Sequence, residues 1–251
     1  MKTVFITGAS SGIGEACARK FAANGYRLIL NARRQDKLQT LAENLNKEFG
    51  TENKLLCFDV RDRETARQAI SGLEKEWADI DVLVNNAGLA LGLEKEYIGD
   101  FEDWDTMIDT NIKALLSITR FVVPGMVERG KGHIINIGSV AGDAAYPNGA
   151  VYCATKAAVK TLSDGLRMDL VDTPLRVTNI KPGLVETNFS VTRFHGDQER
   201  ADNVYKGIEP LTGNDIAECV YFAANAPAHV QVAEILVLAT HQGSGSLIHR
   251  V

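Results

Sequence analysis

Tyr152 and Lys156 are the pair of residues with the most evident chemical use in this sequence. Side chains four positions apart on a helix lie on one face, and no other tyrosine has a lysine four residues later. A free phenol, with a pKa of about 10, is a poor proton carrier near neutrality, but a neighbouring ammonium stabilises the phenolate and lowers that pKa. Unless it is only a surface helix contact, the pair is predicted to exchange a proton with a carbonyl or an alcohol. Ser139 offers a hydroxyl at the end of the apolar run 134–137.

A glycine-rich turn, Thr7 to Gly14, follows the apolar run Val4 to Ile6 and leads into a helical pattern. Glycines let a chain turn tightly and let backbone N–H groups approach a pyrophosphate at a helix N-terminus. The spacing G-x-x-x-G-x-G differs from the common G-x-G-x-x-G, and a turn without a ligand is the alternative. The residues expected to bind a cofactor here are Gly8, Ser10, Ser11, Gly12, Ile13 and Gly14.

Arg33 and Arg34 follow the second apolar run, where an NAD enzyme places a carboxylate on the ribose. Two guanidinium groups suit a 2′-phosphate instead, so the sequence favours NADP; a solvated pair of arginines is the alternative. Other expected cofactor contacts end the third and fourth runs, although each could be a plain turn. They are Asp59, Val60, Asn85, Ala87 and Gly88.

Short apolar runs alternate with helical patterns, which is typical of βαβ units and a parallel sheet. We predict strands at 4–6, 28–30, 55–58, 82–84, 133–137, 177–180 and 235–238, and helices at about 15–23, 36–49, 63–77, 104–129 and 151–172. The expected fold is α/β: a single-domain, Rossmann-type, doubly wound parallel sheet of seven strands, with helices on both faces, spanning 1–251. The polar segment 186–210 is predicted to be a substrate lid.

The composition narrows the function classes. The chain has 251 residues, 45% of them hydrophobic, and a formal net charge of -5, which disfavours nucleic-acid binding. Four separated cysteines are expected to be free thiols, and neither a signal peptide nor a membrane span is apparent. A cytoplasmic protein without a metal site is therefore expected, since the five histidines lack metal-binding motifs.

These motifs together resemble the short-chain dehydrogenase/reductase family, over residues 1 to about 240. The motifs are Thr7-Gly8 to Gly14, Asn85-Asn86-Ala87-Gly88, Asn111, Ser139, Tyr152-x-x-x-Lys156 and Pro182-Gly183. The resemblance implies a nicotinamide cofactor, Tyr152 as acid and base, and Lys156 on the nicotinamide ribose. It also implies that Ser139 orients the carbonyl and that Asn111 anchors a water linking Lys156 to solvent. Further implied cofactor contacts are Pro182, Gly183, Val185 and Thr187.

A narrower likeness is to the bacterial NADP-dependent 3-hydroxy acid dehydrogenases, through the runs 85–92, 103–111 and 124–129. This subgroup includes serine and allo-threonine 3-dehydrogenases and reducers of malonic semialdehyde, and it implies a homotetramer. The expected reaction moves hydride between the nicotinamide and the 3-position of small acids such as L-allo-threonine, serine or 3-hydroxypropionate. The alternatives are a broad carbonyl or 3-oxoacyl reductase and, from another class, a non-catalytic NADP-sensing protein.

A substrate of this kind carries a carboxylate, so a cation is expected in the pocket. Arg193, in the predicted lid, is the candidate from its position, ahead of His195. A solvated loop arginine is the alternative. Ser139 and Tyr152 are the other residues expected to touch the substrate.

Overall fold

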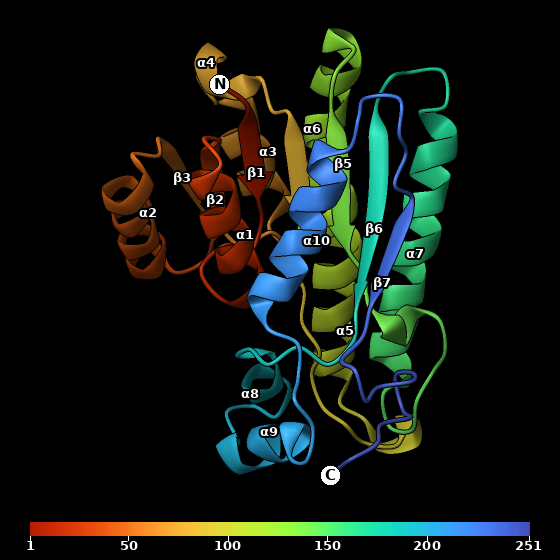
Figure 1. Cartoon of the computed structure of the whole chain (residues 1–251). Helices are drawn as coiled ribbons and strands as arrows, with labels where there is room; N and C mark the ends of the chain where they lie inside the picture. The colour runs from red at the N-terminus through yellow and green to blue at the C-terminus, as the bar shows by residue number, and fades with distance from the viewer.

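Seven parallel strands form one sheet in the computed structural model, which describes residues 1–251 (Figure 1). The strands are β1 (Thr3–Ile6), β2 (Arg27–Ala32), β3 (Asn53–Cys57), β4 (Val82–Asn85), β5 (His133–Ile137), β6 (Arg176–Pro182) and β7 (Glu234–Val237). Their order is β3-β2-β1-β4-β5-β6-β7, which confirms the predicted Rossmann-type sheet. The order reverses beside β1, and open α/β sheets bind ligands at the carboxyl ends of strands near such a point.

Helices cover both faces of the sheet (Figure 1). One face carries α1 (Gly12–Ala23), α2 (Gln35–Phe49) and α10 (Gly213–Asn225), and the other carries α3 (Arg63–Ser71), α6 (Leu115–Arg129) and α7 (Ala150–Asp169). The remaining helical pieces are α4 (Lys75–Ala78), η1 (Glu96–Ile98), α5 (Phe101–Ile108), η2 (Asp109–Ala114), η3 (Val140–Gly142), α8 (Phe189–Arg193) and α9 (Gln198–Tyr205).

Alternate strand residues enter two separate hydrophobic cores. Val4 and Ile6 of β1 pack under α1 and α10, whereas Phe5 between them packs under α3 and α6. Val84 and Leu83 of β4 divide in the same way. Because both faces are covered, the strands read as continuous apolar runs rather than as an alternation of apolar and polar residues.

Three helical regions differ from the sequence prediction. The helix predicted at 63–77 ends at Ser71, because Gly72 follows and the short α4 begins at Lys75. The helix α10 was not predicted, although Thr212 and Asp215 form a reciprocal capping box at its start. The segment 186–210, predicted to be a lid and assigned no helix, contains α8 and α9.

No helix has the length and the apolar composition that crossing a membrane requires. No group of three or more His, Cys, Asp or Glu side chains is placed to hold a metal ion. All four cysteines are unpaired, and only Cys57 is exposed.

Candidate active site

A cavity of about 840 Å³ runs along the carboxyl ends of the strands. Its size is in the range of ordinary small-molecule sites. Most of the predicted site residues line it: Gly8, Ser10, Ser11, Gly12, Ile13, Arg33, Arg34, Asp59, Val60, Ala87, Gly88, Ser139, Tyr152, Lys156, Pro182, Gly183, Val185, Thr187 and Arg193. Gly14, Asn85 and Asn111 lie outside this lining.

The turn from β1 into α1 leaves room for a ligand against bare backbone. Gly12 has a φ of +57°, in the region that favours glycine, and a Cβ on Gly14 would overlap the carbonyl oxygen of Gly8. The Ser11 side chain forms no capping hydrogen bond at the start of α1. Free N–H groups of the first turn and the helix dipole together favour an anion at this end of the cavity.

Thr7 and Asn86, which belong to the predicted motifs but were assigned no role of their own, join the glycine turn to the end of β4. Asn86 Nδ2 donates to the backbone oxygens of Thr7 at 2.9 Å and Gly8 at 3.1 Å. In return, Thr7 Oγ1 accepts from the backbone N–H groups of Asn86 at 3.1 Å and Ala87 at 3.0 Å. The available signal was that both are polar and directly follow buried strands. These bonds fix the shape of the cavity beside the switch in strand order.

The side chain of Asn85 lies in the interior instead of in the cavity. Its Nδ2 donates to Thr119 Oγ1 at 3.0 Å and to Asn136 Oδ1 at 2.9 Å, on the face of the sheet covered by α6 and α7. The parity of β4 explains this, because Asn85 shares a face with buried Leu83. Its side chain therefore links β4 to β5 and α6 in the interior, and a contact of Asn85 with the cofactor would come from its backbone.

Arg33 and Arg34 are exposed at the rim of the cavity beyond β2. Arg61, which the sequence reasoning missed, joins them there and donates from Nη2 to Asp59 Oδ2 at 2.7 Å. Burial alone would raise the pKa of Asp59, but hydrogen bonds from Arg61 and the charge of Arg33 hold that pKa below its ordinary value. Arg61 and Arg33 both lie within ion-pair distance of Asp59, and Arg34 lines the same rim. Three guanidinium groups against one carboxylate leave this rim positive and suited to a phosphate.

Tyr152 and Lys156 lie together in the first half of α7 and are both buried, with 8% and 6% exposure. Lys156 Nζ donates to the backbone oxygen of Ile137 at 2.9 Å and lies 5.9 Å from the centroid of the Tyr152 ring. The edge of the Phe189 ring packs against Tyr152, with centroids 5.7 Å apart. The pair therefore faces the cavity from one helix face, and the alternative of a surface contact does not describe it.

Burial shifts the pKa values of both side chains. It raises the pKa of the Tyr152 phenol, as does neighbouring Tyr146, while the Ser139 hydroxyl and the Arg193 charge act in the opposite direction. Burial lowers the pKa of Lys156 to about 8, because the ammonium loses its water. The sequence reasoning expected Lys156 to bring the Tyr152 pKa down, but the net direction is upward.

Ser139 is the N-cap residue of η3, two residues after the end of β5. Its Oγ accepts from the backbone N–H of Ala141 at 3.1 Å and donates to the backbone oxygen of Pro182 at 3.4 Å. The hydroxyl lies close enough to Tyr152 to favour the phenolate. Two hydroxyl groups thus converge on one part of the cavity, where a carbonyl or alcohol oxygen could bind both.

Asn111 lies in η2, a π-helical turn between α5 and α6. Its Nδ2 donates to the Leu89 backbone oxygen at 2.8 Å and to Thr155 Oγ1 at 3.0 Å, and its Oδ1 accepts from the Leu89 N–H at 2.9 Å. The neighbouring Thr110 lines the cavity, and its buried Oγ1 has no hydrogen-bond partner. π-Helical turns often occur at functional sites, and here one turn holds Asn111 behind the cavity wall and Thr110 at its surface.

Arg193 extends from α8 into the cavity beside the predicted catalytic tyrosine. Its Nε donates to the Gly92 backbone oxygen at 3.1 Å, and its Nη1 donates to the Tyr146 hydroxyl at 3.0 Å. The guanidinium carbon is 5.7 Å from the centroid of the Tyr152 ring. Both hydrogen-bond partners are neutral, so the positive charge is available to an anion. His195, the weaker candidate, is exposed and contacts Asp103 at 3.0 Å, outside the cavity lining.

The last residues of the chain return to the cavity near α8 and α9 (Figure 1). Those in its lining are Gln242, Gly245, Ser246, Ile248 and Arg250, none of which the sequence analysis singled out. Gln242 Oε1 accepts from the Leu184 N–H at 2.8 Å, and the Val251 N–H donates to the Gly207 oxygen at 2.9 Å. The tail therefore contacts both ends of the segment that carries Arg193.

Comparisons with known proteins agree with this geometry. The family model described as short chain dehydrogenase matches residues 2–198. The chain is 48% identical over 249 residues, 98% of this chain and 99% of the relative, to the NADP-dependent 3-hydroxy acid dehydrogenase of Salmonella typhi. It is 41% identical to serine 3-dehydrogenase of Rhizobium radiobacter, with 99% and 98% covered. The closed form of a serine dehydrogenase complexed with NADP+ superposes with a TM-score of 0.93 at 45% identity, with 99% of this chain and 100% of that one covered.

Proposed function

We propose that this chain, which belongs to the short-chain dehydrogenase family, is an NADP-dependent oxidoreductase that acts on the 3-position of small 3-hydroxy acids. L-allo-Threonine, serine and 3-hydroxypropionate are the candidate substrates. The observation that carries the substrate class is the guanidinium of Arg193, free of carboxylates and 5.7 Å from the Tyr152 ring centroid. A carboxylate held there would place its β-carbon near the phenol.

The cavity fits NADP at both ends. At the glycine turn, Gly8 and Gly12 line the cavity and would bring bare backbone to a pyrophosphate, while Gly14 lets α1 begin close against Gly8. The rim beyond β2 presents Arg33 and Arg34 for the 2′-phosphate. Asp59, Val60, Ala87 and Gly88 would flank the adenosine half, and Pro182, Gly183, Val185 and Thr187 would contact the nicotinamide half. The relatives named above include two described by their NADP requirement or their NADP+ complex.

The chemistry divides between the cofactor and four side chains of the chain. A bound nicotinamide supplies a hydride acceptor or donor at its C4. Tyr152 takes the hydroxyl proton when the alcohol is oxidised and returns it when the carbonyl is reduced. Lys156 holds the ribose and brings its positive charge near the phenolate, Ser139 orients the reacting oxygen, and Asn111 anchors a water behind Lys156.

Oxidation at the 3-position leaves a carbonyl β to the carboxylate. The product of serine or allo-threonine is then a 3-oxo acid, which can lose carbon dioxide without a further enzyme group. Arg193 would bind the carboxylate of the hydroxy acid through charge-assisted hydrogen bonds. We propose that the segment 186–210 is a lid that holds Arg193 at the substrate. The Arg193 side chain supports this, because its hydrogen bond to the Gly92 oxygen fixes α8 over the cavity.

A matched pair of substrates tests the proposal. We expect kcat/KM for 3-hydroxypropionate to exceed that for its methyl ester by about tenfold or more, because the ester lacks the charge that Arg193 binds. Formation of reduced cofactor would be followed with NADP and with NAD, and NADP is expected to be preferred. Equal values for acid and ester would favour a broad carbonyl or 3-oxoacyl reductase. Tight NADPH binding with no turnover of any alcohol or carbonyl would favour a non-catalytic sensor.

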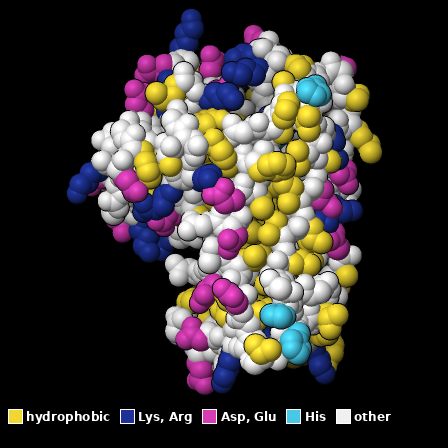
Figure 2. Space-filling model, viewed as in Figure 1, with side chains coloured by type: hydrophobic (Ala, Val, Ile, Leu, Met, Phe, Trp, Pro, Cys, Tyr) yellow, Lys and Arg dark blue, Asp and Glu magenta, His cyan; other side chains and the backbone are white.

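We also propose a homotetramer. Figure 2 shows hydrophobic side chains gathered in a strip over α10 and beside it. Phe222 of α10 is 64% exposed and Leu236 of β7 is 48% exposed, while Met168 and Val171 near the end of α7 form a second exposed apolar group. Two apolar faces of this kind suit two symmetry-related interfaces. Light scattering of the purified chain and of Phe222→Asp would test the assembly.

The free thiols suit a cytoplasmic location.

A further inference from the structure

We propose that Lys181 is a positioning residue, which holds the turn carrying Ser139 through an ion pair with Asp143. Lys181 lies on β6, one residue before the cavity-lining Pro182, and its side chain is only 6% exposed. It does not line the cavity itself.

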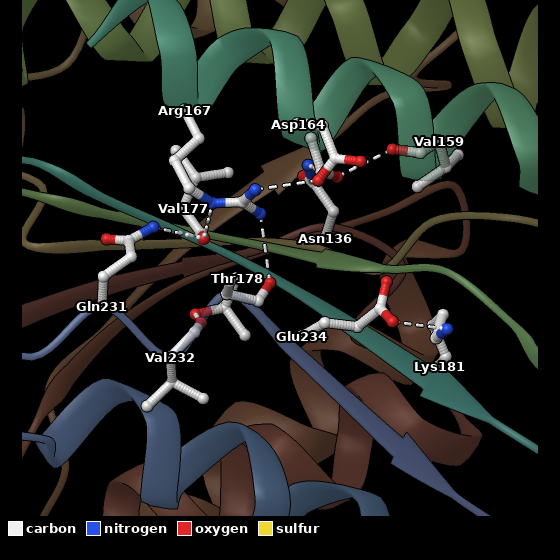
Figure 3. Close-up of polar contacts among 12 residues, drawn as sticks. Asn136, Val159, Asp164, Arg167, Val177, Thr178, Lys181, Gln231, Val232 and Glu234 are labelled. Carbon is white, nitrogen blue, oxygen red and sulfur yellow. Dashed lines mark hydrogen bonds and ion pairs between the residues drawn. The ribbon is translucent and has the colours of Figure 1, made fainter. Parts of the chain in front are cut away.

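The ammonium of Lys181 joins three separate parts of the fold. Nζ donates to Asp143 Oδ1 at 2.9 Å and to Asp143 Oδ2 at 2.8 Å. It also lies 2.6 Å from Glu234 Oε1, a contact drawn in Figure 3. Glu234 begins the edge strand β7, whereas Asp143 ends η3. The ammonium is buried and both carboxylates are partly exposed, so these two anions fix its place, because a buried charge without a partner is costly.

Asp143 is coupled to Ser139 through one short turn. The backbone N–H of Gly142 donates to the Ser139 oxygen at 3.0 Å, and that of Asp143 donates to the Val140 oxygen at 3.1 Å. Gly142 leaves no space for a side chain, since a Cβ there would come within 2.7 Å of the Lys156 oxygen. The turn thus lies between β6 and α7, and the Lys181 contact fixes its far end.

Ser139 has few restraints of its own. Its hydroxyl bonds within the turn to the Ala141 N–H, and its contact with the Pro182 oxygen is long, at 3.4 Å. The position of the hydroxyl therefore depends on the turn as a rigid unit. A shift of about 1 Å in a group that orients the reacting oxygen can lower the rate by as much as about a hundredfold.

The two carboxylates on Lys181 provide a matched control. Asp143→Ala and Glu234→Ala each leave the ammonium with one carboxylate, so their effects on stability should be similar, but only Asp143 belongs to the Ser139 turn. We expect Asp143→Ala to lower kcat about tenfold or more and Glu234→Ala to change it less than about twofold. The dissociation constant for NADPH, measured by tryptophan quenching, should stay near the wild-type value in both.

A double-substitution cycle separates positioning from a general structural effect. If Asp143 acts through Ser139, Asp143→Ala should lower kcat no further in a Ser139→Ala background. Lys181→Arg, which keeps the charge, should retain most of the turnover and serves if Asp143→Ala folds poorly. The inference is overturned if Asp143→Ala and Glu234→Ala have equal kcat, or if Asp143→Ala gives its full loss without Ser139. It rests on the proposed function for its assay, and an inactive wild-type chain would refute that function instead.

Discussion

Replacing Arg193 by Met gives the sharpest test of the proposed substrate class. The guanidinium has five N–H donors, and contacts with Gly92 and Tyr146 use two of them. The others can bind a carboxylate, and a hydrogen bond to a charged group contributes about 1.5 to 3 kcal/mol. We therefore expect Arg193→Met to lower kcat/KM for 3-hydroxypropionate by about 10- to 150-fold.

The ester substrate controls for indirect effects of Arg193. Its charge also favours the Tyr152 phenolate, so some loss should occur with any substrate. The carboxylate contact is given by the ratio of kcat/KM for the acid to that for the methyl ester, measured in wild type and variant. Tyr146→Phe, which removes a neutral partner of Arg193 but keeps the cation, should change this ratio by less than about fivefold. An unchanged ratio in Arg193→Met would refute the assignment of Arg193.

Three further predictions concern the cofactor, the tail and the buried lysine. Arg33→Ala with Arg34→Ala should raise the dissociation constant for NADP about tenfold or more and leave that for NAD nearly unchanged, as measured by calorimetry; equal losses would contradict the 2′-phosphate assignment. Deleting residues 241–251 should raise KM for the hydroxy acid and lower kcat, because the tail contacts Leu184 and Gly207 at the two ends of the lid segment. Tm should fall only slightly. Unaltered kinetics would exclude the tail from the site. Burial lowers the pKa of Lys156 to about 8, so the unfolded chain binds this proton more tightly than the folded chain does. The buried lysine therefore lowers the free energy of unfolding by its full amount below pH 8. This penalty should diminish by roughly 1–2 kcal/mol as the pH rises from 8 to 10. Urea unfolding should show this slope in the wild type relative to Lys156→Met, and parallel pH curves would argue against it.

The sequence predicted the elements that depend on short-range pattern. Tyr152 and Lys156 share a face on any helix, and the glycines after β1 form a binding turn wherever a strand leads into a helix. Each motif therefore depends only on its own local element. Largely apolar runs of three to five residues placed all seven strands, because a parallel sheet covered on both faces buries nearly every residue of its central strands. These patterns are local, so one sequence was sufficient to detect them.

Features that depend on contacts between distant segments were not predicted. Nothing near Gln242 indicates that the tail returns to Leu184, and no local pattern joins Lys181 to Asp143. The inward direction of the Asn85 side chain follows from its parity with Leu83, which the sequence does contain. The raised pKa of Tyr152 arises from burial, which spacing alone does not measure.

Tyr152→Phe tests the central claim most directly, namely that the buried phenol carries the proton in the reaction. The substitution removes only the hydroxyl, so packing against Phe189 should persist. We expect kcat to fall by about a hundredfold to ten-thousandfold while the dissociation constant for NADPH changes less than about threefold. A variant that binds NADPH normally and keeps more than about a tenth of the wild-type kcat would contradict the account.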